Sequence, residues 1–283
     1  MIWVIFAFVS IASISVANLY QRIAMKQSIS DPYASSIIFQ ILVTLVTFVF
    51  VIFHGISLPS SNLVFNVLIS TSLYAGGTLA YFHALKAIEA SESAILASFG
   101  GLVTITSAYA FLGERLNSLQ LFGVFIIIFG VLIITASSKK IRFNKGMLFA
   151  ILGAALYGLA TTNDTFILHH SADAITYTSL ISLTPGILLL IIHPKAIKSI
   201  IATTKNPAIM KPLILYCFFY GIQAITYFLS LASGAKASQL SILFKLEIIS
   251  TVILATIFLR ERDNLPRKII ATIIVSIGAY LLI

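Results

Sequence analysis

Ten stretches of this chain are apolar over about 20 residues, the length that a helix needs to cross the hydrocarbon core of a bilayer. They cover residues 2–24, 34–53, 63–85, 93–112, 119–137, 146–168, 174–193, 210–232, 238–259 and 266–283. The stretches are continuously apolar, without the alternation of a barrel strand, so helices are expected. The connections between them are too short to fold as separate domains. The sequence therefore predicts an all-α integral membrane protein with ten transmembrane helices.

Composition supports the same class of protein. Hydrophobic residues make up 59% of the chain and charged residues only 10%, whereas a soluble domain has about 25% charged residues. The formal net charge of +9 comes mainly from lysines and arginines in the short connections. This placement indicates membrane topology and not nucleic-acid binding. We expect a multi-pass protein of the cell (inner or plasma) membrane, with the lipid bilayer as its partner.

The basic residues are divided unequally between the two sets of connections. Connections after odd-numbered stretches hold 15 lysines and arginines, and those after even-numbered stretches hold only Arg115 and Lys236. Cytoplasmic loops carry the excess of positive charge in membrane proteins. Both chain termini are therefore predicted to lie outside the cytoplasm.

One short motif occurs twice. Phe-Leu-x-Glu-Arg is found at Phe111–Arg115 and again at Phe258–Arg262. A shift of 147 residues that aligns the motifs also aligns Ile95-Leu96 with Ile242-Leu243. Five apolar stretches separate the copies, and an odd number places them in opposite orientations across a membrane. Such inverted repeats are typical of secondary transporters.

The repeat divides the chain into two five-helix units. With a shift of 142, Asp31 also coincides with Asp173, each just before a corresponding stretch. The predicted organisation is a first repeat over residues 1–137, a basic linker over 138–145 and a second repeat over 146–283.

With these features the chain resembles the EamA family of the drug/metabolite transporter superfamily. The resemblance covers the whole length and rests on the ten stretches, the two copies and one glycine and charge motif in each copy. The motif residues are Leu112–Asn117 with Gln120, Gly123 and Gly130 in the first copy, and Leu259–Asp263 with Gly278 in the second. The chain departs from the family pattern at Leu246–Ile249, where a proline is lost, and at Gly100-Gly101, where members often carry a proline.

The resemblance implies a transporter of small metabolites that works by alternating access. It also implies a central cavity lined mainly by the first, third, fourth, sixth, eighth and ninth stretches. Members are commonly drawn with cytoplasmic termini. Our topology prediction follows the charge bias instead, because inverted twins can insert either way.

Lys245 and Glu247 are ionisable residues inside the ninth stretch. A charge at that depth is costly unless it faces a cavity or a partner. Two positions apart on a helix correspond to about 200°, so both side chains cannot point to one cavity from a regular helix. Either at least one contacts substrate or a coupling proton, or Lys245 reaches the interface and Glu247 pairs with a neighbouring helix.

The eighth stretch carries a polar stripe. Tyr216, Tyr220, Gln223 and Tyr227 follow one another at steps of four, three and four residues, which places them on one helical face. Lipid-facing tyrosines are expected near the interfaces only. The stripe predicts a cavity wall, and a hydrogen-bonded seam between helices is the alternative.

Three other stretches contain similar candidates. They are Tyr74 and Tyr81 in the third stretch, Tyr157 and Asp164 in the sixth, and Asn18 in the first. Asp164 is close enough to the end of its stretch for a simple interfacial position to be an alternative.

A cation, a carboxylate and several tyrosines suit a zwitterion or a compound with an aromatic part. The predicted substrate is an amino acid or an amino-acid derivative similar to S-adenosylmethionine. The alternatives are an exporter of lipophilic drugs or cations, and a lipid-handling membrane protein. The sequence contains no nucleotide-binding, metal-ligand or nucleophile motif, so neither an enzyme nor a cofactor is expected. Proton coupling, the direction of transport and the choice between monomer and dimer stay open.

Overall fold

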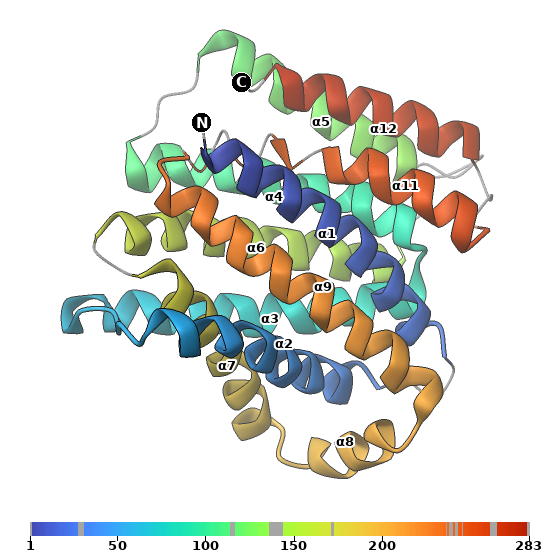
Figure 1. The fold of residues 1–283 in the computed structure, drawn as a ribbon. Helices are drawn as coiled ribbons and strands as arrows, with labels where there is room; N and C mark the ends of the chain where they lie inside the picture. Colours follow the sequence, from blue (N-terminus) through green and yellow to red (C-terminus); the bar gives the residue numbers. More distant parts are fainter. Residues whose placement is uncertain are drawn as a thin grey trace.

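The computed structural model describes residues 2–27, 31–113, 117–135, 144–170, 173–235, 237, 240, 243–244, 246–260 and 265–281. Within these residues the fold is helical and contains no strand. The helices are α1 (Ile2–Met25), α2 (Pro32–His54), α3 (Val64–Ala87), α4 (Ala90–Leu112), α5 (Ser118–Thr135), α6 (Lys145–His169), α7 (Ala174–Ile192), α8 (Ala196–Thr204), α9 (Pro207–Ala232), α11 (Leu246–Phe258) and α12 (Leu265–Tyr280), and a 3₁₀ turn, η1 (Ser61–Leu63), precedes α3. Figure 1 shows them as one bundle.

Seven of the described helices have the length and hydropathy of a membrane span. They are Ile2–Met25, Pro32–His54, Ser61–Ala87, Ile95–Leu112, Lys145–His169, Ala174–Ile192 and Pro207–Ala232. Helices α5, α11 and α12 lie in the three remaining predicted stretches. The chain is thus a multi-pass helical membrane protein, and ten as the number of spans stays a prediction.

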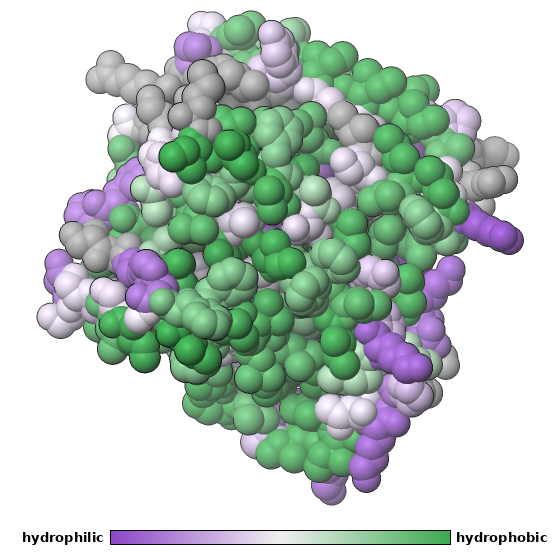
Figure 2. All heavy atoms as spheres, in the orientation of Figure 1, coloured by the Kyte–Doolittle hydropathy of each residue, from purple (hydrophilic) through white to green (hydrophobic). Residues whose placement is uncertain are grey.

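The outer surface has the character of a lipid-facing one. Large apolar side chains point outward along α2 and α5, among them Phe53, which is 87% exposed, and Phe125. In Figure 2 hydrophobic residues cover the middle of the visible face, and most of the hydrophilic residues lie toward its two sides. An apolar belt between polar ends matches the hydrocarbon core between its two aqueous interfaces.

Helix packing follows the predicted repeat. Helix α1 packs along α9 as α6 packs along α3, and α1 contacts α11 as α6 contacts α4. Helices α2 and α7 pack on each other, and so do α5 and α12. Each helix of α1–α5 has a counterpart, in order, in α6, α7, α9, α11 and α12. Replacing every helix in these pairs by its counterpart gives the same set of contacting pairs. In Figure 1 α1 begins at the end of the bundle where α6 ends, so the two units are inverted.

The ends of equivalent helices also correspond. The Asp31 side chain accepts a hydrogen bond from the Tyr33 amide at the start of α2, and Asp173 accepts one from the Thr176 amide at the start of α7. Both aspartates therefore act as N-caps. After α4 and α11, Gly113 and Arg260 have φ angles of 71° and 55°. Their separation of 147 residues equals the shift that aligns the two motifs, whose Glu-Arg pairs lie outside the described residues.

One helix crossing brings backbone against backbone. A Cβ atom on Gly158 of α6 would lie 2.4 Å from the carbonyl oxygen of Gly100, and one on Gly100 of α4 would lie 2.7 Å from the carbonyl oxygen of Ala154. The Thr104 hydroxyl donates to the Gly158 carbonyl across the same contact, at 3.2 Å. Small residues allow such close packing in membranes. The two repeats therefore pack closely where α4 crosses α6.

Candidate substrate cavity

A cavity of about 230 Å³ lies between the two repeats. Its lining comes from α1, α2, α3 and α4 of the first repeat and from α6, α7, α9 and α11 of the second. Six tyrosines line it, namely Tyr74, Tyr81, Tyr157, Tyr216, Tyr220 and Tyr227. Amide side chains contribute as well, from Asn18, Gln21, Gln40 and Gln223. The cavity is therefore polar and aromatic, although its surroundings are apolar.

Most of the residues predicted from sequence meet at this cavity. Those that line it are Asn18, Tyr74, Tyr81, Tyr157, Tyr216, Tyr220, Gln223, Tyr227 and Glu247. Lys245 lies outside the described residues. Asp164 lies beside the cavity and does not line it. The structure thus gathers residues from five helices at one place, and their role in substrate binding stays a prediction.

Glu247 is held at the crossing of α1 and α11. The Asn18 Nδ2 atom donates a hydrogen bond of 2.6 Å to Glu247 Oε1. Asn18 belongs to the first repeat and Glu247 to the second, so this bond joins the two units inside the cavity wall. Among the described lining residues, Glu247 is the only Asp, Glu, Lys, Arg or His.

A chain of hydrogen bonds connects three helices on one wall. Gln40 Nε2 of α2 donates to the Thr78 hydroxyl of α3 at 2.9 Å, and Thr78 is 2.8 Å from the hydroxyl of Tyr157 on α6. Tyr74 and Tyr81 contact Tyr157 edge-on, with ring centroids 5.4 and 5.5 Å apart. This wall is fixed by bonded hydroxyls and by interlocking rings.

The α9 stripe forms another wall, as its spacing predicts. Tyr216 stacks on Phe39 with ring centroids 4.8 Å apart, and Tyr220 meets Phe39 edge-on at the same distance. The Tyr227 hydroxyl donates to the Thr161 hydroxyl of α6 at 3.3 Å. The four stripe residues therefore line the cavity and also form helix contacts, so both interpretations of the stripe describe part of the structure.

Asp164 is fully buried inside the protein. It is 0% exposed and faces α3 and α7, and its role in substrate binding stays a prediction. Ser70 and Tyr177 donate to its Oδ1 atom and Tyr74 donates to Oδ2, each at 2.6 Å. Asp164 thus fixes the position of one lining tyrosine.

Sequence reasoning missed the contributions of α2 and α7. Phe39 and Gln40 of α2, and Ile181 and Ser182 of α7, line the cavity together with residues from the six expected helices. Gln40 could have been found, because a lone glutamine inside a long apolar stretch requires a polar partner. Phe39 has no such signal, since phenylalanine is equally common on lipid-facing surfaces.

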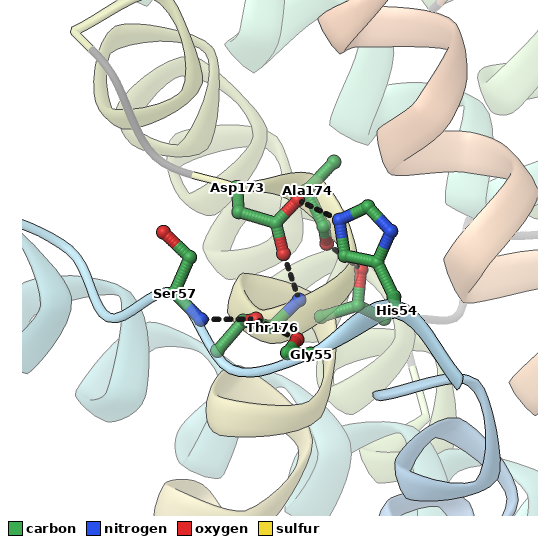
Figure 3. Close-up of polar contacts among 7 residues, drawn as sticks. His54, Gly55, Ser57, Asp173, Ala174 and Thr176 are labelled. Atoms are coloured by element: carbon green, nitrogen blue, oxygen red, sulfur yellow. Dashed lines mark hydrogen bonds and ion pairs between the residues drawn. The ribbon is translucent and has the colours of Figure 1, made fainter. Parts of the chain in front are cut away.

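A further polar contact joins the repeats where α2 ends and α7 begins. Figure 3 shows His54 Nε2 directed at Asp173 Oδ1, 3.0 Å away, and the Ser57 amide donating to the Thr176 hydroxyl at 3.1 Å. Burial raises the pKa of Asp173, but hydrogen bonds from Thr176 and the nearby His54 outweigh it, so the pKa lies below its ordinary value. The ionised Asp173 is therefore favoured here.

A helical membrane protein made of two inverted repeats around a shared polar cavity has the architecture of a secondary transporter. The chain belongs to the EamA-like transporter family, which it matches over residues 1–136 and 144–283. It is similar to a solved structure described only as the crystal structure of a protein. The TM-score is 0.61 and the identity 15%, over 98% of this chain and 94% of the other, which shows the fold alone. A comparison with curated proteins found no match.

Proposed function

We propose that this protein is a secondary transporter that carries an amino acid or a small amino-acid derivative by alternating access. The position of the cavity is the observation that carries the proposal. Both repeats line it, so a movement of one repeat against the other changes the side from which it is reached. Membership in a transporter family supports the same conclusion.

The lining favours a substrate with an amine. Glu247 supplies a carboxylate, and tyrosine faces attract a cation electrostatically. The amides of Gln40 and Gln223 have N–H groups that suit a substrate carboxylate. Lys245 would add a cation for the same carboxylate, and this remains a prediction from sequence.

The size of the cavity narrows the class further. A volume of about 230 Å³ is below the roughly 300–1,000 Å³ of pockets that hold drug-sized ligands. It favours a single amino acid or a small aromatic amine over S-adenosylmethionine, which carries a nucleoside in addition. The polar lining disfavours a lipid or a lipophilic drug, because burying these hydroxyls and amides against an apolar ligand is costly.

Binding to the purified protein tests the proposal first. Thermal-shift measurements would compare phenylalanine, tyramine, adenosine, S-adenosylmethionine and tetraphenylphosphonium. We expect stabilisation by phenylalanine or tyramine, followed by saturable uptake of the same compound into proteoliposomes. Stabilisation by tetraphenylphosphonium alone would overturn the amino-acid assignment in favour of a drug exporter.

A further inference from the structure

The carboxylate of Asp164 is buried beside the cavity and is held by hydroxyl groups. Its three donors are Ser70 and Tyr74 of α3 and Tyr177 of α7, each at 2.6 Å. No Lys, Arg or His in the described part of the chain forms an ion pair with it. An ionisable group inside a membrane span is costly and usually functional.

Only one of the three donors opens on the cavity. Tyr74 belongs to the lining, and Ser70 and Tyr177 do not. Tyr74 therefore connects the Asp164 carboxylate to the wall of the cavity. The Tyr74 ring also contacts the ring of Tyr157 edge-on, with centroids 5.4 Å apart. Tyr157 lines the cavity too, so this contact helps to fix the position of Tyr74.

The groups around Asp164 are neutral in the described structure. The titratable groups facing it are Tyr74 from α3, Tyr177 from α7 and Tyr227 from α9. Helix α4 also packs on α6, and there the Ser107 hydroxyl lies 2.6 Å from the Thr162 hydroxyl. On α6 itself, His169 and His170 lie at the end of the helix, and the His170 ring bonds the Phe166 carbonyl.

We propose that Asp164 binds the proton that couples to transport, and that Tyr74 transmits its protonation state to the cavity. The coupling role rests on the proposed transport function, whereas proton binding itself does not. In the ionised state Tyr74 donates its O–H to Asp164 Oδ2. When a hydronium ion in the cavity gives a proton to Tyr74 Oη, the original O–H bond breaks and that proton bonds to Oδ2. Hydronium becomes water, and Asp164 becomes neutral.

This transfer reverses the direction of one hydrogen bond. The protonated Asp164 donates to Tyr74 Oη, and the new Tyr74 O–H turns toward the cavity. There it can donate to an acceptor group of the substrate, such as a carboxylate. Proton binding therefore strengthens substrate binding, and by linkage substrate binding strengthens proton binding to the same extent.

Infrared difference spectroscopy tests the proton site without a substrate. Lowering the pH of the purified wild-type protein should produce a C=O stretch of a buried carboxylic acid. The band should shift when aspartate, but not glutamate, is isotopically labelled. The chain has four aspartates, Asp31, Asp164, Asp173 and Asp263. Asp164→Asn should abolish the band, and Asp31→Asn, which keeps a capping side chain at α2, should retain it in full.

Tyr74→Phe gives a second variant in case Asp164→Asn folds poorly. The band should remain but change its frequency, because the protonated carboxyl loses the tyrosine oxygen as its acceptor. Absence of any titrating aspartate band in the wild-type protein, or its persistence in folded Asp164→Asn, would overturn the proposal.

Uptake assays distinguish a failure of the proton-coupling proposal from a failure of the proposed transport function. Uptake of phenylalanine coupled to one proton should vary by up to about tenfold per pH unit in the wild-type protein, and Asp164→Asn should flatten the profile. An unchanged profile in Asp164→Asn sinks the coupling role and leaves the transporter intact. If the wild-type protein takes up no phenylalanine while the band titrates, that substrate assignment fails and the proton site stands.

Discussion

Gly113 and Arg260 occupy the same position in the two repeats, and both adopt the left-handed backbone conformation that ends a helix. Their φ angles are 71° and 55°, after α4 and α11. Glycine adopts this conformation without strain, whereas a side chain costs about 1 kcal/mol or more. The shared Phe-Leu-x-Glu-Arg motif therefore encodes a helix end, which the second copy forms with a less suitable residue.

Exchanging the residue at this position should change stability in opposite directions in the two repeats. Arg260→Gly should stabilise the protein by about 1 kcal/mol, because it removes the strain of a positive φ. Gly113→Ala should destabilise it by about the same amount. Thermal unfolding in detergent measures both. Equal signs for the two substitutions would contradict the equivalence of the two positions.

The Asn18–Glu247 hydrogen bond should matter for binding an amine. Glu247→Gln should weaken binding of tyramine by about 10- to 100-fold, since a hydrogen bond to a charged group contributes about 1.5–3 kcal/mol. Isothermal titration calorimetry would measure this change. Ser72→Ala is a matched control, because its exposed hydroxyl bonds to the Leu68 carbonyl of its own helix. Unchanged affinity in folded Glu247→Gln would remove Glu247 from the binding site.

The crossing of α4 and α6 should tolerate no added methyl group. In Gly158→Ala the new Cβ would meet the Gly100 carbonyl oxygen at 2.4 Å, and the backbone must move. We expect a loss of about 1–3 kcal/mol, the usual range for overpacking. Gly76→Ala is the control, since its Cβ would meet only the end of the Leu156 side chain, at 3.1 Å. Similar unfolding temperatures for the two variants would show that this crossing is not close-packed.

The stability that the Asp173 cap gives to the start of α7 should depend on pH. Because the pKa of Asp173 is lower in the native state, its carboxylate stabilises the fold above its ordinary pKa of about 3.9, and the stabilisation is lost as pH falls through the native value. Asp173→Asn keeps a capping side chain and should remove this dependence. Asp173→Ala should cost about 1 kcal/mol at neutral pH. Melting curves from neutral pH to about pH 3 would test both. A constant difference between wild type and Asp173→Asn over this range would refute the assignment.

The orientation in the membrane can be tested by cysteine labelling. The only cysteine, Cys217, is buried, so Cys217→Ser provides a clean background. In intact cells an impermeant maleimide should label Ser57→Cys, between α2 and α3, and should spare Lys198→Cys on α8 until the membrane is opened. The charge bias predicts this result, and the reverse pattern would place both termini in the cytoplasm.

Helical periodicity made much of the cavity predictable. The α9 stripe is one example, because tyrosine and glutamine at steps of three and four can share one face only on a helix, and Tyr216 and Gln223 do line the cavity. The alignment of the two repeats was also predictable, from the spacing between the two copies of the motif. Asp31 and Asp173 accordingly cap equivalent helices.

The surroundings of Asp164 could not be predicted. Its hydroxyl donors come from α3 and α7, and their approach depends on how three helices pack. For α2 the sequence offers one signal, because a lone glutamine in an apolar stretch requires a polar partner. It does not say which helix supplies that partner, and packing against α3 directs Gln40 to Thr78.

The exchange symmetry of the helix contacts has a consequence for the transport cycle. If each repeat adopts the conformation that its twin has here, the same pairs of helices meet again and the cavity faces the opposite side of the membrane. The chain then encodes two end states with one set of interfaces. The positions where the twins differ set the energy gap between those states, and Gly100 and Glu247, 147 residues apart, are such a pair. If the proposed transport cycle is correct, a substitution at either one shifts the resting orientation of the carrier as well as its fit to the substrate.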